Sequence, residues 1–164
     1  MMNKQAIIHS LGLEPHPSEG GYFKRIYTSE IEIACAAGTR KILSSIYYLL
    51  TDDSPVGYLH RNKSDIVHYF HSGSAITYYI IHPDGQFETQ VLGNDLSKGQ
   101  TPQLTVKGGC WKASELTEGE YGLLSEAVSP GFEYEDMVLA NINDIQRYPP
   151  KLLRLIKQYL KEAN

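Results

Sequence analysis

From residue 41 onward the hydrophobic pattern is that of short β-strands. The segment KILSSIYYLL (41–50) is rich in β-branched and aromatic residues, which favour strands. Turn signals such as Pro83-Asp84-Gly85 separate the strands. Further strands are predicted near 21–28, 57–62, 65–71, 75–82, 86–92, 103–107, 110–114, 121–129 and 132–139. About nine or ten short strands at this regular spacing indicate an all-β sandwich or barrel.

The two ends of the chain have a helical pattern instead. Residues 3–11 place Ala6, Ile7 and Leu11 on one side, and Gly12 is expected to end this helix. Near the C-terminus, PPKLLRLIKQYLKEAN opens on two prolines and sets an apolar face against Lys and Arg. We therefore expect short N- and C-terminal helices, the latter packed on the body or on a partner. Residues 30–40 show no clean period and predict an irregular strand and loop, and residues 1–164 are predicted to form a single domain.

Composition and charge place the chain among ordinary globular proteins. Apolar residues make up 41% and charged residues 21%, and the net charge is −4. The chain has no basic stripe, which disfavours nucleic-acid binding. We also expect no membrane partner and no signal peptide, because no apolar run approaches the roughly 18 residues that span a bilayer. Two cysteines make no disulfide framework, so a cytoplasmic protein with reduced thiols is expected.

The candidate chemistry concentrates between Gly57 and Gly73, in the sequence GYLHRNKSDIVHYFHSG. His60, His68 and His71 lie in this segment, which otherwise reads as two strands. Titratable side chains on strands with a buried face are costly unless they line a cavity. The segment therefore predicts the wall of a pocket.

Five ordered segments carry a resemblance that covers nearly the whole chain. They are HPSEGGYFKRIY (16–27), SSIYYLL (44–50), LHRNKSD (59–65), LGNDLSKGQTPQLTVKGGCW (92–111) and SPGFEYEDM (129–137). With them the chain resembles the DUF985 (Cupin_5) group of the cupin superfamily. The resemblance implies a double-stranded β-helix, which is a jelly-roll-like barrel, and usually a homodimer. The group has been described as predicted sugar epimerases, and its biochemical role is otherwise largely undefined.

The chain departs from the cupin pattern at the metal ligands. The first cupin motif is G-x5-H-x-H-x3,4-E-x6-G, and His60, position 66 and Gly73 fall at its spacings. Asn62 stands at the second histidine position, Ile66 at the glutamate position and Lys112 where the last histidine is expected. An aliphatic side chain cannot bind a metal, and an ammonium repels one. We therefore expect neither a bound metal nor another cofactor.

The first functional hypothesis is a metal-independent isomerase or epimerase. It would act on a small molecule in the barrel, such as an anionic sugar, a nucleotide sugar or a related carbonyl compound. His60 is the candidate base and a tyrosine the candidate acid, with Tyr22, Tyr58 and Tyr134 as choices. A non-catalytic cupin that binds a small ligand is the alternative. A metal-dependent enzyme, with His60, His68 and a carboxylate as ligands, is disfavoured.

Six further residues are expected to contact the ligand, because they lie at inward-facing strand positions or near the barrel mouth: Glu19, Arg25, His68, Phe70, Lys112 and Phe132. Arg25 would anchor an anionic group, and Glu19 would close over the mouth. His68 either lines the pocket or only fills the space of a tryptophan found in related proteins. Lys112 either carries its charge inward or snorkels to the rim.

Overall fold

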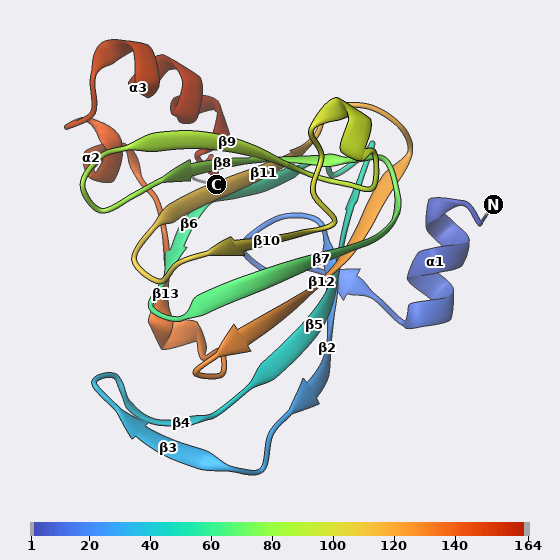
Figure 1. Ribbon diagram of the computed structural model, residues 1–164, viewed down its shortest axis with the longest axis horizontal. Helices are drawn as coiled ribbons and strands as arrows, with labels where there is room; N and C mark the ends of the chain where they lie inside the picture. Colours follow the sequence, from blue (N-terminus) through green and yellow to red (C-terminus); the bar gives the residue numbers. More distant parts are fainter. Residues whose placement is uncertain (1, 163–164) are drawn as a thin grey trace.

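The computed structural model describes residues 2–162 and consists mainly of two facing antiparallel sheets (Figure 1). The first sheet has the order β1-β2-β5-β12-β7-β10, with bounds Glu14–Pro15, Tyr22–Thr28, Ser44–Thr51, Tyr121–Ser129, Asp65–Gly73 and Gln103–Val106. The second has the order β13-β6-β11-β8-β9, with bounds Met137–Leu139, Val56–Asn62, Trp111–Leu116, Ile76–Ile81 and Phe87–Leu92. A separate hairpin joins β3 (Glu32–Cys35) to β4 (Gly38–Lys41). The arrangement confirms the predicted all-β, jelly-roll-like fold.

Three apolar clusters hold these layers together. The central cluster joins both sheets and includes Leu50, Tyr78 and Leu124, none more than 1% exposed. A second cluster packs the outer face of the five-stranded sheet against α2 (Ile142–Ile145), α3 (Pro150–Ile156) and the 3-10 turn Lys157–Tyr159. The third covers one end of the six-stranded sheet with α1 (Lys4–Leu11). Helices therefore cover the outer face of the five-stranded sheet and one end of the six-stranded sheet, and the space between the sheets is left for the site.

The helical predictions are confirmed, and two of the strand predictions need correction. Gly12 ends α1 in the left-handed conformation, and the amphipathic α3 packs on the protein's own sheet. The segment 30–40 is a regular hairpin, because its strands pair with each other outside the two main sheets. The strand predicted near 132–139 begins only at Met137, since Tyr134–Asp136 forms a 3-10 turn. No helix within residues 2–162 is long and apolar enough to span a membrane.

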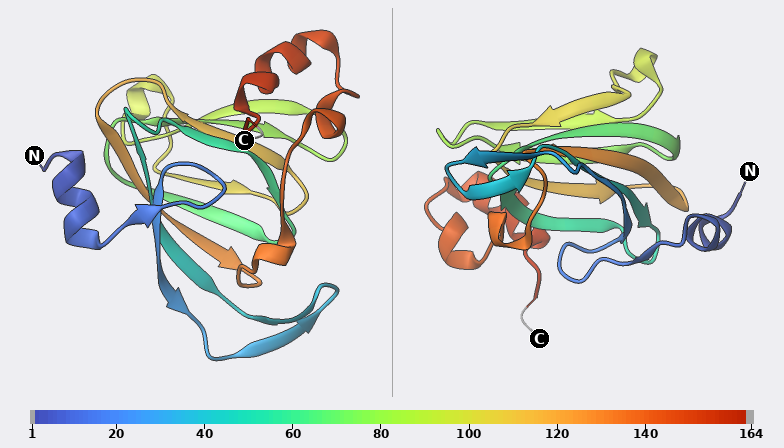
Figure 2. Two further views of the ribbon diagram at one scale, coloured as in Figure 1. Left: turned by 180° about the vertical axis from the view of Figure 1, so that it is seen from behind. Right: turned by 90° about the horizontal axis from the view of Figure 1, so that it is seen from below.

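The loop between β1 and β2 determines where the site can form. Figure 2 shows it arching across the space between the two sheets. The amide of Tyr58 donates a hydrogen bond of 2.8 Å to the carbonyl of Glu19, and Ser54 accepts one from the amide of Gly21. These bonds tie the loop to β6 and to the turn before it. The loop therefore closes one side of the barrel with its own polar side chains.

The outer edge of β2 carries exposed apolar side chains. Among the described residues, β2 pairs with β1 only at Tyr22 and Phe23, so its edge from Lys24 onward has no strand partner. Ile26 on β2 is 48% exposed, and Ile31, which follows β2 in the chain, is 63% exposed. Open strand edges of this kind pair readily with another chain.

We propose that a second copy of the chain covers this edge, as a homodimer. Replacing Ile26 and Ile31 together by Asp is expected to convert the dimer to a monomer, because the charges would be buried without partners. Analytical ultracentrifugation measures the change. The matched control is Leu96→Asp, at an equally exposed apolar residue in the turn Leu96–Lys98. A wild-type protein that sediments as a monomer at micromolar concentration contradicts the prediction.

Candidate functional site

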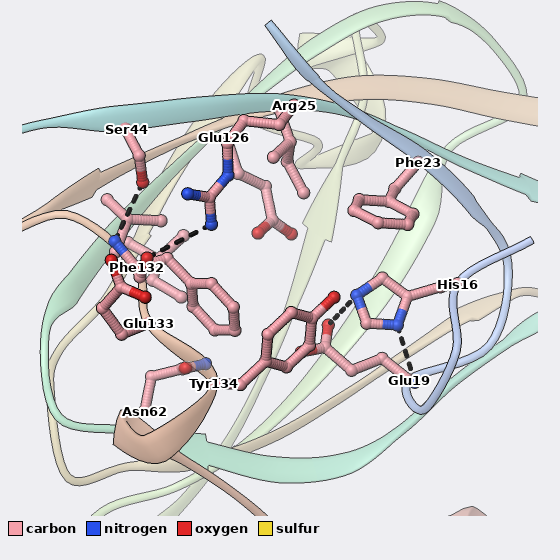
Figure 3. A pocket seen from close by; sticks show the side chains of 13 residues that line it. His16, Glu19, Phe23, Arg25, Ser44, Asn62, Glu126, Phe132, Glu133 and Tyr134 are labelled. Atoms are coloured by element: carbon pink, nitrogen blue, oxygen red, sulfur yellow. Dashed lines mark hydrogen bonds and ion pairs between the residues drawn. The ribbon is translucent and has the colours of Figure 1, made fainter. Parts of the chain in front are cut away.

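A cavity of about 340 Å³ opens between the sheets beneath the β1–β2 loop (Figure 3). Its walls come from this loop, from β2, β5, β6, β7 and β12, and from the segment after β12. The lining residues are His16, Glu19, Phe23, Arg25, Ser44, Ile46, Asn62, Ile66, Glu126, Val128, Phe132, Glu133 and Tyr134. A mostly apolar wall with a few convergent polar groups is typical of a small-molecule site.

Strand alternation explains which side chains reach the cavity. On β12 the residues Leu124, Glu126 and Val128 share the buried face. The first packs in the core, and the other two line the cavity. On β2 the same alternation brings Phe23 and Arg25 to the cavity. Glu126 is therefore the one carboxylate on an otherwise apolar inward face of β12, and it lines the cavity.

The floor of the site is a buried cluster of Lys112, His68 and Glu126. The Lys112 Nζ lies 2.8 Å from His68 Nε2 and 3.7 Å from Glu126 Oε1, and His68 Nε2 lies 3.3 Å from the same oxygen. The cross-strand register sets these contacts: Glu126 pairs with His68 between β12 and β7, and Lys112 pairs with His60 between β11 and β6. Both sheets therefore contribute to one polar centre.

Charges and tautomers follow from these contacts. An ammonium can only donate, so His68 accepts at Nε2 and carries its proton on Nδ1. Burial, together with Lys112, lowers the pKa of His68 to about 4. Burial also opposes the charge of Glu126, but the Lys112 ammonium outweighs it and holds the pKa of Glu126 well below its usual range. The cluster is therefore a lysine–glutamate ion pair beside a neutral imidazole.

A second group of polar side chains surrounds Glu19 at the cavity wall. Glu19 Oε2 lies 3.5 Å from His60 Nε2 and 3.8 Å from His16 Nε2. Gly20 makes this placement possible, because its φ is +82° and a Cβ there would lie 2.3 Å from the Val56 carbonyl oxygen. The loop can thus lay the Glu19 backbone directly against β6. The carboxyl group ends between two imidazoles.

The two imidazoles present different hydrogen-bonding groups to Glu19: His60 an acceptor and His16 a donor. His60 Nδ1 lies 2.7 Å from the Tyr58 carbonyl and must donate to it, so Nε2 is an open lone pair. His16 Nδ1 accepts from the amides of Ser18 and Glu19, so its Nε2 carries the proton. A protonated Glu19 can therefore donate towards His60 while it accepts from His16. The arrangement can hold and pass a proton.

The pKa values of the two cavity carboxyls are shifted in opposite directions. Burial raises the pKa of Glu19, although His16 opposes the shift. Glu126 is shifted downward by the neighbours described above. Burial and Lys112 lower the pKa of His60 to about 4, so this imidazole is neutral near pH 7. Two carboxyl groups with divergent pKa values in one cavity are typical of an acid–base pair with divided roles.

Several predicted site residues meet at this cavity. Glu19, Arg25, Phe132 and Tyr134 all line it. Arg25 donates a 3.2 Å hydrogen bond to the Phe132 carbonyl, and its guanidinium lies 5.8 Å from the centre of the Phe132 ring. Figure 3 shows these side chains directed into the same space as Glu126. Their functional roles stay predictions.

Other predicted residues do not line the cavity. Tyr22 packs in the cluster around α1, because alternation on β2 turns it away from its neighbour Phe23. Phe70 packs against the central apolar cluster and does not line the cavity. His60, His68 and Lys112 are buried behind the cavity wall, where Glu19 and Glu126 separate them from the open space. Tyr22 and Phe70 are therefore not part of the cavity lining.

Sequence reasoning selected neither Glu126 nor His16 as a site residue. The loss of the cupin glutamate at position 66 suggested that the barrel lacked a carboxylate, but Glu126 supplies one from another strand. Its sequence signal was available: it alternates with the apolar Leu124 and Val128. His16 showed no such pattern, because loop conformation alone brings it to Glu19.

The position where cupins bind a metal is not suited to one in this chain. Within residues 2–162 no group of three or more His, Cys, Asp or Glu side chains is arranged to hold a metal ion. The Lys112 ammonium lies at hydrogen-bonding distance from His68 Nε2, the nitrogen that a metal would need. A metal cation at that point would meet the positive charge of Lys112.

The buried histidines predict a specific dependence of stability on pH. An imidazole whose pKa falls from 6.5 to about 4 on folding binds its proton only in the unfolded chain between these values. Lowering the pH from 7 to 4.5 should therefore reduce the free energy of unfolding, by about 2 kcal/mol for each of His60 and His68. Glu19 acts in the opposite sense, because its pKa is raised. Glu126 begins to lose its contribution only below pH about 4.5.

Urea denaturation at both pH values measures this loss. His68→Gln is expected to remove roughly half of it, and substitution of the exposed His9 by Gln should leave it unchanged. A pH dependence that is the same in His68→Gln as in the wild type would contradict the prediction.

Comparison with known proteins agrees with the fold. Residues 5–140 match the Cupin superfamily (DUF985) family. An uncharacterized protein of Saccharomyces cerevisiae is 40% identical over 147 residues, which cover 80% of this chain and 72% of the yeast protein.

Solved structures give the same assignment. A hypothetical protein from Leishmania major superposes with a TM-score of 0.91 at 29% identity, covering 98% of this chain and all of the other. A Shewanella oneidensis protein has a TM-score of 0.89 at 33% identity, covering 99% of this chain and 100% of the other. Oxalate decarboxylase from Bacillus subtilis, at 16% identity and a TM-score of 0.58 over 91% of this chain and 35% of its own, shares the fold alone. The chain belongs to the DUF985 family of the cupin superfamily.

Proposed function

We propose that this protein is a metal-independent enzyme of the isomerase or epimerase type. It would move a proton at a carbon next to the carbonyl group of a small polyhydroxylated compound. The observation that carries the proposal is the pair of cavity carboxyls, Glu19 and Glu126, whose environments shift their pKa values apart. Such a division supplies one group suited to proton transfer and one that stays charged.

Glu19 is the group that exchanges the proton with the substrate in this proposal. Its raised pKa makes it a stronger base than Glu126. Two imidazole nitrogens lie near Glu19 Oε2. The lone pair of His60 Nε2 favours the protonated form of Glu19, and the N–H of His16 favours the ionised form. His60, the base expected from the sequence, would then act through Glu19. Tyr134, from the segment after β12, also lines the cavity and is the candidate acid.

The remaining lining suggests the substrate class. Glu126 stays ionised and can accept hydrogen bonds from substrate hydroxyls. The rings of Phe23, His16 and Phe132 offer flat surfaces for a sugar ring. Arg25, which remains exposed at the mouth, can pair with a carboxylate or phosphate. A hydroxylated carbonyl compound with an anionic end satisfies all three features.

Exchange of the substrate α-proton with solvent tests the proposal. The protein is incubated in D2O with a panel of aldoses, ketoses, sugar phosphates and sugar acids, and deuterium incorporation is followed by NMR. Glu19→Gln is expected to slow exchange by about 10²- to 10⁴-fold, the usual contribution of a general acid–base group. Tyr22→Phe, outside the cavity, is the matched control for Tyr134→Phe and should leave the rate unchanged.

A non-catalytic binding protein gives a different result. The predominantly apolar wall, with Phe23, Ile46, Val128 and Phe132, would also suit ligand retention without chemistry. In that case some panel members raise the melting temperature, but none exchanges its proton. Exchange that survives Glu19→Gln unchanged would contradict the assigned base.

A further inference from the structure

Lys112 is a fully enclosed ammonium whose partners come from the opposite sheet. Its side chain is 5% exposed, and it reaches from β11 to His68 on β7 and Glu126 on β12. Removing an ammonium from water costs several kcal/mol unless anions and acceptors surround it. The Glu126 carboxylate and the His68 lone pair meet that need. The barrel centre is thus built to hold a cation.

The same partners are chemically suitable for a metal ion. An imidazole nitrogen and a carboxylate oxygen are common ligands of divalent transition metals. Lys112 itself stands at the position where the cupin pattern has the last histidine ligand. Its register partner across β11 and β6 is His60, the one ligand of the first cupin motif that the chain retains. The Lys112 ammonium therefore comes from the strand position that supplies a metal ligand in the cupin pattern.

We propose that the Lys112 ammonium is the resident cation of this barrel and takes the place that a metal ion has in other cupins. Tethering the cation to β11 makes its presence independent of metal supply. The ion pair also keeps Glu126 ionised at the cavity. If the proposed function holds, the pair positions Glu126 to accept from substrate hydroxyls while Glu19 transfers the proton.

Cobalt(II) binding by Lys112→His tests the proposal without any substrate. This variant removes the ammonium and adds an imidazole beside His68 and Glu126. We expect it to bind about one Co²⁺ per chain with a visible absorption band, because three nitrogen and oxygen ligands then converge. The wild type should retain no Co²⁺ after gel filtration. Elemental mass spectrometry and absorption spectra report both quantities.

Two control variants make the result specific. Lys112→Met fills the same space without charge or imidazole and should bind no Co²⁺. Adding His68→Ala to Lys112→His should abolish the absorption band. A wild-type protein that binds stoichiometric Co²⁺ and loses it on His68→Ala would overturn the proposal. So would a folded Lys112→His protein that binds none, or a Lys112→Met protein that binds equally well.

A stability measurement applies even if Lys112→His does not fold. Lys112→Met leaves Glu126 charged and unpaired, so its melting temperature should fall below that of the wild type. Adding Glu126→Gln removes the unpaired charge and should restore part of the loss. A double variant no more stable than Lys112→Met would show that the two groups are not paired. Because no readout here depends on turnover, failure of the proposed reaction would leave these results unaffected.

Discussion

The buried ion pair between Lys112 and Glu126 is the constraint on which the site depends. Two opposite charges in a protein interior are tolerated only when each has the other and further hydrogen bonds. Here the two sheets must pack so that Lys112 on β11 reaches Glu126 on β12, with His68 in contact with both. The pair therefore ties the chemistry of the cavity to the packing of the two sheets.

The ion pair also differentiates the carboxyl groups of the cavity. Glu126, close to the ammonium, is held as a carboxylate. Glu19 lies on the β1–β2 loop beside two neutral imidazoles, and burial makes its charged form less favourable. Identical functional groups thus acquire different roles through their neighbours alone. This division is how a cavity without a metal can offer both a fixed charge and an exchangeable proton.

The sequence predicts the fold well because the relevant signals are local. Turn residues and apolar strand segments indicate the barrel, and Gly12 and the prolines at 149–150 indicate the terminal helices. The hairpin at 32–41 escaped prediction because its strands are mostly exposed and lack an apolar face.

The site is less predictable, because its members meet across strands and loops. His60, Glu19, Arg25 and Tyr134 could be chosen from their positions in the family pattern. Glu126 could have been recognised from its inward alternation on β12, but its pairing with Lys112 depends on how the two sheets pack. The grouping of His16 with Glu19 depends on a loop conformation that Gly20 permits, and no periodic pattern encodes it.

The protonation of the buried histidines tests the central claim most directly. Long-range proton–nitrogen NMR spectra of the nitrogen-15-labelled protein at pH 7 reveal the charge and tautomer of each imidazole. Our account predicts that His68 and His60 are neutral with the proton on Nδ1, and that His16 is neutral with the proton on Nε2. A protonated His68 would contradict it, since Lys112 would then have to be an uncharged amine and the barrel would hold no tethered cation.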